Sequence, residues 1–136
     1  MLKRIMAKLQ ESTVKTDLKP FHKTLIEIHA LGESLKSLSI EGLKEKIPEL
    51  DTQAKVFAVV IEASHRLLGM RPFDSQILAG LALFEGFVTD MKTGEGKTLA
   101  AAAPNIANAL AERKVYLLTF NDYLAKRDSD LLLPLY

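Results

Sequence analysis

The stretch from residue 91 to residue 98, MKTGEGKT, constrains the fold of this chain more than any other feature. The apolar pair Phe87 and Val88 precedes it, and an alanine-rich segment that favours a helix follows it. Two glycines let the backbone turn so that consecutive N–H groups can point inward at an anion. Strand, glycine-rich loop and helix in that order predict a phosphate-binding loop at the positive end of a helix. The alternative is a plain glycine turn.

The loop supplies the candidate nucleotide ligands. Lys97 would place its charge among the β and γ phosphates, and the Thr98 hydroxyl would bind Mg²⁺. Glu95 would contribute its backbone N–H more than its carboxylate. The usual GxxxxGK[ST] pattern has glycine where this chain has Met91, so the loop is closer to the variant of helicase-like motors. The full set of candidates in the loop is Gly94, Glu95, Gly96, Lys97 and Thr98.

Composition excludes several classes of function. The 136 residues suffice for one domain, and a net charge of +1 gives no general attraction to nucleic acid. The chain has no cysteine, which excludes disulfides and thiolate chemistry, and its three histidines do not have HExxH spacing. The sequence has neither a membrane-spanning apolar run nor a signal peptide. We therefore expect a cytoplasmic protein.

The first half of the sequence predicts helices, and we expect an N-terminal helical segment over residues 1–50. A helix should follow Pro20, and another should run from about Thr52 to Leu68, with Gly69 at its end. The basic amphipathic residues 1–9 would bind anionic phospholipid or pack against protein.

The second half, residues 51–136, predicts a partial P-loop nucleotide-binding domain of the α/β class. Residues 87–89 and the apolar run 115–120 have the character of buried parallel strands, with the helix after the loop between them. Strand, loop, helix and strand make one βαβ unit, with the loop at the carboxyl end of its first strand.

Four strings in fixed order make the pattern specific. They read FAVVIEAS at 57–64, MRPFDSQ at 70–76, MKTGEGKT at 91–98 and TFNDYLAKRD at 119–128. The second lies where a helicase Q-motif would lie. Together they resemble the SecA family of preprotein translocase ATPases, which reads FAVVxEAS, MRxFDxQ, M[RK]TGEGKT and TxNDYLAxRD in that order. The connection before Phe57 looks shorter than usual, which suggests a divergent or accessory paralogue.

The resemblance implies ATP and Mg²⁺ as cofactors and the start of a RecA-like P-loop domain, incomplete at its C-terminus. Gln76 would recognise adenine. Phe73 and Met70 would lie beside the base, although core packing explains them equally well. Arg71 would orient this motif or be a solvated surface charge. The 121–128 segment would couple the site to neighbouring domains, or be an ordinary capped helix.

The resemblance also implies a function that the chain lacks the residues to complete. The family would couple ATP hydrolysis to protein translocation, with preproteins and a membrane channel as partners, at the cytoplasmic face of the membrane. No apolar strand ending in Asp-Glu is present to hold Mg²⁺ and orient water, so the catalytic set is incomplete. We expect weak nucleotide binding, negligible hydrolysis and no nucleic-acid binding. The alternatives are a non-catalytic docking module for a membrane or channel, and a fragment of a nucleic-acid helicase.

Overall fold

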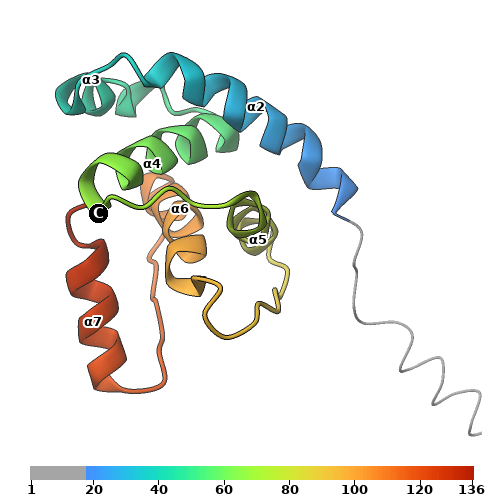
Figure 1. Ribbon diagram of the computed structural model, residues 1–136, viewed down its shortest axis with the longest axis vertical. Coiled ribbons are helices and arrows are strands. Elements are labelled where there is room, and N and C mark those ends of the chain that lie inside the picture. Colours follow the sequence, from blue (N-terminus) through green and yellow to red (C-terminus); the bar gives the residue numbers. More distant parts are fainter. Residues whose placement is uncertain (1–17) are drawn as a thin grey trace, which may run out of the picture.

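The computed structural model describes residues 18–136, which form six α-helices and one 3-10 turn. The helix α4 packs against α2 on one side and α6 on the other, and α5 packs against both α2 and α6 (Figure 1). The amphipathic residues 1–9 lie outside the described residues. The elements are α2 (Lys19–Leu35), α3 (Ile40–Glu45), η1 (Ile47–Glu49), α4 (Gln53–Leu68), α5 (Asp74–Phe84), α6 (Lys97–Leu110) and α7 (Asp122–Leu132).

The helix ends follow local capping chemistry. At the start of α4, the Thr52 side chain accepts a hydrogen bond from the Lys55 N–H at 3.3 Å. The helix ends at Gly69, which adopts the left-handed conformation. Pro20 lies in the first turn of α2, where its missing N–H costs nothing. Both helices predicted from the first half of the sequence are thereby confirmed.

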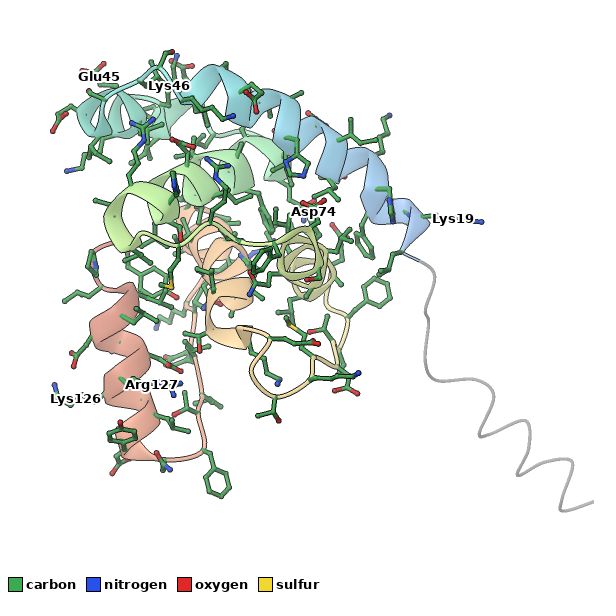
Figure 2. The ribbon with its side chains drawn as sticks, viewed as in Figure 1. Lys19, Glu45, Lys46, Asp74, Lys126 and Arg127 are labelled. Carbon is green, nitrogen blue, oxygen red and sulfur yellow. The ribbon has the colours of Figure 1, made fainter. Side chains whose placement is uncertain are left out.

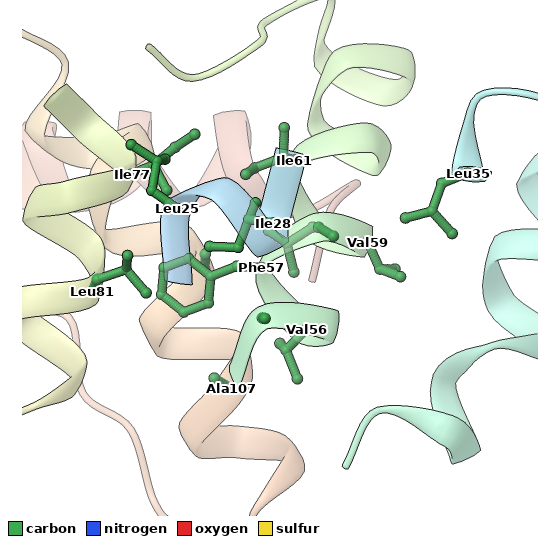
Figure 3. Packing of buried hydrophobic residues seen from close by; sticks show 14 of the residues in the cluster. Leu25, Ile28, Leu35, Val56, Phe57, Val59, Ile61, Ile77, Leu81 and Ala107 are labelled. Carbon is green, nitrogen blue, oxygen red and sulfur yellow. The ribbon is translucent and has the colours of Figure 1, made fainter. Parts of the chain in front are cut away.

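The hydrophobic core forms where α4 meets its neighbours (Figure 3). Phe57 of α4 and Ile28 of α2 are each 1% exposed, and Leu81 of α5 is fully buried. Burying a side chain of this size contributes about 1.5–3 kcal/mol. The same cluster includes Ala107 of α6, so the core joins helices that lie before and after the glycine-rich loop in the sequence.

The predicted α/β fold is wrong for the described part of the chain. Residues 18–136 contain no β-strand, so neither the βαβ unit nor a RecA-like parallel sheet is formed. A strand needs hydrogen bonds from a neighbouring strand, and residues 87–89 and 115–120 supply none to each other. Val88 is 99% exposed and Leu118 is 88% exposed, whereas Phe87 packs edge-on against Phe21 of α2 with ring centroids 6.0 Å apart.

The apolar content of these two segments is typical of strands, but the fold does not bury it. The region from the end of α6 to the start of α7 is extended, as Figure 1 shows. Within residues 18–136, no helix has the length and the apolar character that crossing a bilayer requires.

Candidate nucleotide-binding loop

The glycine-rich loop connects α5 to α6 and has the backbone bends that its sequence predicts. Gly94 has a φ of 87° and Gly96 a φ of 73°, which is the left-handed region that favours glycine. The helix α6 begins at Lys97, immediately after the second bend. A Cβ atom built on Gly94 would meet no atom within 4 Å, so the loop is open on that side. The turn therefore leads directly into the positive end of a helix.

Two side chains of the loop bind the loop's own backbone. The Lys97 ammonium donates to the Lys92 carbonyl oxygen at 2.8 Å. The Glu95 carboxylate accepts from the Lys92 N–H at 3.0 Å. A backbone amide of the loop thus already binds an anionic oxygen, which is the chemistry that a phosphate would need. Lys97 and the loop amides fit a phosphate group.

Gln76 is the residue that the tertiary structure adds to the loop. It is only 7% exposed, its Oε1 accepts from the Phe73 N–H at 2.9 Å, and its Nε2 donates to the Glu95 carbonyl at 2.8 Å. A Cβ on Gly96 would lie 2.2 Å from Gln76 Nε2, so any larger residue at this position would require the Gln76 amide to move. The structure therefore joins the predicted adenine residue to the predicted phosphate loop across 19 residues of sequence.

The other predicted site residues lie near this junction with different exposures. Phe73 is 75% exposed, so core packing does not account for it, whereas Met70 is partly buried. Thr98 lies in the first turn of α6 and is partly buried. In residues 18–136 no group of three or more histidine, aspartate or glutamate side chains could hold a metal ion.

Sequence reasoning missed the role of Glu62, which lies buried in α4. Its carboxylate binds Arg66 Nε at 2.8 Å through Oε1 and an Arg71 guanidinium nitrogen at 2.5 Å through Oε2. Burial opposes ionisation, yet the hydrogen bonds from Arg66 and Arg71 hold the pKa of Glu62 below its usual value. The four-residue spacing of Glu62 and Arg66 signalled one of these pairs. Arg71 is thus not a free surface charge.

The 121–128 segment forms the start of α7. Asn121 caps the helix, because its Oδ1 accepts from the Leu124 N–H at 2.9 Å. Asp128 is 6% exposed and bonds to the neighbouring Arg127 guanidinium at 2.6 Å. Figure 2 shows Lys126 and Arg127 on this helix. These contacts are those of a capped helix with its own ion pairs.

The chain matches the SecA DEAD-like domain family over residues 5–136. It is 42% identical to the protein translocase subunit SecA of Cellvibrio japonicus over 147 residues, covering 100% of this chain and 16% of the relative. The identity is 46% with the subunit SecA of Thermotoga neapolitana, covering 90% of this chain and 15% of the relative. The chain thus spans about a sixth of the length of these relatives. With all but four residues matched, the chain belongs to the SecA DEAD-like domain family.

Proposed function

We propose that this chain forms the ATP-binding part of a SecA-type motor, which couples ATP hydrolysis to protein translocation across a membrane. One observation carries the proposal: Gln76 is bonded to the loop whose two left-handed glycines lead into α6. The relatives in Cellvibrio japonicus and Thermotoga neapolitana are both protein translocase subunits. Family membership favours this function over that of a nucleic-acid helicase fragment.

The residues of the site would bind the phosphates, the base and the metal ion of Mg-ATP. Lys97 would exchange the Lys92 carbonyl for the β and γ phosphate oxygens, which are stronger acceptors because they carry charge. The amides near Gly94 and Gly96 would donate to the same phosphates, and Gln76 would lie toward the adenine side. Thr98 would supply one oxygen ligand to Mg²⁺, which when bound neutralises phosphate charge.

We propose that the chain alone binds nucleotide weakly and hydrolyses it negligibly. Thr98 is the one Mg²⁺ ligand that the motif supplies, and the sequence has no apolar segment that ends in Asp-Glu. The attacking water therefore has no carboxylate to orient it. Preproteins and a membrane channel are the partners that we propose for a SecA-type motor with this domain, acting at the cytoplasmic face of the membrane.

Calorimetric titration of Mg-ATP and of inorganic tripolyphosphate tests the site. We expect Lys97→Ala to weaken the binding of both ligands by about tenfold, because the hydrogen bonds from its ammonium to phosphate oxygens are charge-assisted. Lys114→Ala is the control, since it removes the same charge from an exposed residue beyond the other end of α6. Equal affinities for wild type and Lys97→Ala, or no binding by folded wild type, would contradict the proposal.

A second experiment tests the membrane partner. We propose that residues 1–9 bind anionic phospholipid, because they combine basic side chains with an apolar repeat. Flotation with phosphatidylglycerol vesicles should recover the whole chain and lose it when residues 1–9 are removed. Binding that survives Lys97→Ala would show that the membrane contact is independent of the nucleotide site.

A further inference from the structure

Through its two arginine partners, Glu62 links the C-terminal end of α2 to the connection between α4 and α5. Its side chain is 5% exposed, and each carboxylate oxygen binds a different arginine. Arg66 would suffice to neutralise one buried carboxylate. Arg71 brings a second positive charge that is partly exposed, and it comes from the connection between α4 and α5.

Arg66 extends the contact toward the N-terminal helices. Its guanidinium donates to the Leu35 carbonyl at 3.0 Å and the Lys36 carbonyl at 3.2 Å, and it also donates to the Leu38 carbonyl. Carbonyls at the end of a helix have no partner within that helix. Arg66 therefore ties the C-terminal end of α2 to the buried carboxylate.

Arg71 extends the contact toward the opposite side. It lies in the connection that leads to Gln76, where the fully buried Ser64 hydroxyl also donates to the Met70 carbonyl at 2.8 Å. Gln76 then holds the Phe73 N–H and the Glu95 carbonyl. An unbroken series of polar contacts and short chain segments thus runs from the end of α2 to the glycine-rich loop.

The contact of Glu62 with its two arginines is more than a stabilising ion pair. The free energy needed to remove two charges from water offsets much of their attraction, so a buried ion pair is weak evidence for a gain in stability. What the second arginine adds is a fixed position for residues 70–73, which have no regular secondary structure of their own. Asp74 lies at the start of α5 (Figure 2) and forms a separate hydrogen bond of 2.9 Å with His29 of α2.

We propose that Glu62 is a positioning residue that holds, through Arg71, the connection from Met70 to Phe73 in place to receive a purine base. The inference rests on the proposed function and deepens it. It separates base recognition, which depends on Glu62 and Arg71, from phosphate binding, which depends on Lys97. A residue with only a structural role would weaken both together.

The test measures Mg-ATP and tripolyphosphate affinities by calorimetry on the whole chain. Arg71→Ala leaves Glu62 paired with Arg66, so the core keeps its charge balance. We expect it to weaken ATP by about tenfold while tripolyphosphate stays within about twofold. Arg71→Lys should recover part of the ATP affinity, since it restores the positive charge without the planar guanidinium group. Arg113→Ala is the matched control, because this arginine binds Asn108 at the opposite end of α6.

Glu62→Gln provides the second variant, and it should show the same selective loss of ATP affinity. Parallel loss of ATP and tripolyphosphate in the Arg71 variants would overturn the positioning role, as would unchanged ATP affinity. Folded wild type that binds ATP no more tightly than tripolyphosphate would show that the base is not recognised. This inference would then fail, whereas the proposed phosphate site would not. If wild type binds neither ligand, the proposed function itself fails.

Discussion

The helix α4 and the extended segment 115–120 are both rich in apolar residues, but α4 is largely buried and the extended segment is largely exposed. In α4, nine of sixteen residues are buried, including Phe57 at 1% exposure. In the extended segment, Leu118 is 88% exposed and Phe120 is 95% exposed. A helix satisfies its backbone hydrogen bonds internally and can pack at once, whereas an extended segment needs a neighbour before it can be buried. Apolar sequence alone therefore does not determine burial.

The largest effect should come from the same substitution made in both regions. Phe57→Ala removes a ring from the core and should lower the free energy of unfolding by about 3–5 kcal/mol. Phe120→Ala removes an exposed ring and should change it by less than about 0.5 kcal/mol. Urea unfolding followed by circular dichroism measures both. Similar losses for the two variants would show that residue 120 is buried in solution.

Glu62→Gln tests the buried charge of α4. It should lower the free energy of unfolding by about 3 kcal/mol at neutral pH, because it leaves two arginines without their anion. The pKa of Glu62 is lowered in the folded chain, so its ionised form stabilises the fold above the pKa that Glu62 has in the unfolded chain. That contribution is lost as the pH falls through the lowered folded value. Unfolding midpoints between pH 3 and pH 7 should therefore drop less steeply for the variant than for wild type. Identical pH profiles would contradict this assignment.

Gly96→Ala tests the contact between the loop and α5 and should lower the free energy of unfolding by about 1–3 kcal/mol. The positive φ of residue 96 would strain an alanine backbone, and the new methyl would lie 2.2 Å from the Gln76 amide nitrogen. Gly94→Ala is the control, since its φ is also positive but nothing lies within 4 Å. In thermal unfolding, the melting temperature of Gly96→Ala should be lower than that of Gly94→Ala. Equal losses would mean that Gln76 moves away freely.

The smallest effect is expected at the start of α7, which follows the exposed segment. Asn121→Ala removes the cap of the Leu124 N–H and should cost about 1 kcal/mol. Asn121→Asp keeps an acceptor oxygen and should retain most of the stability. Urea unfolding resolves the difference, and an equal loss in both variants would place the effect outside the cap.

Part of the fold and of the site could be predicted from local sequence. Thr52 and Gly69 mark the ends of α4 because capping depends on residues within one turn. The glycines of the loop predicted its bends for the same reason. The two strands were predicted wrongly, since residues 115–120 need a partner that the sequence pattern cannot guarantee. Arg71 likewise gave no local sign of its partner Glu62 in the preceding helix.

The sequence by itself determined α2 and α4, the bends of the glycine-rich loop and the start of α6 at Lys97, because hydrogen bonds within a helix or a tight turn join residues close along the chain. Only the tertiary structure decided that Gln76 bonds to the loop and that Glu62 connects Arg66 to Arg71. It also decided that residues 115–120 remain exposed. These features are not set within one helix or turn, so they depend on how the helices pack against one another.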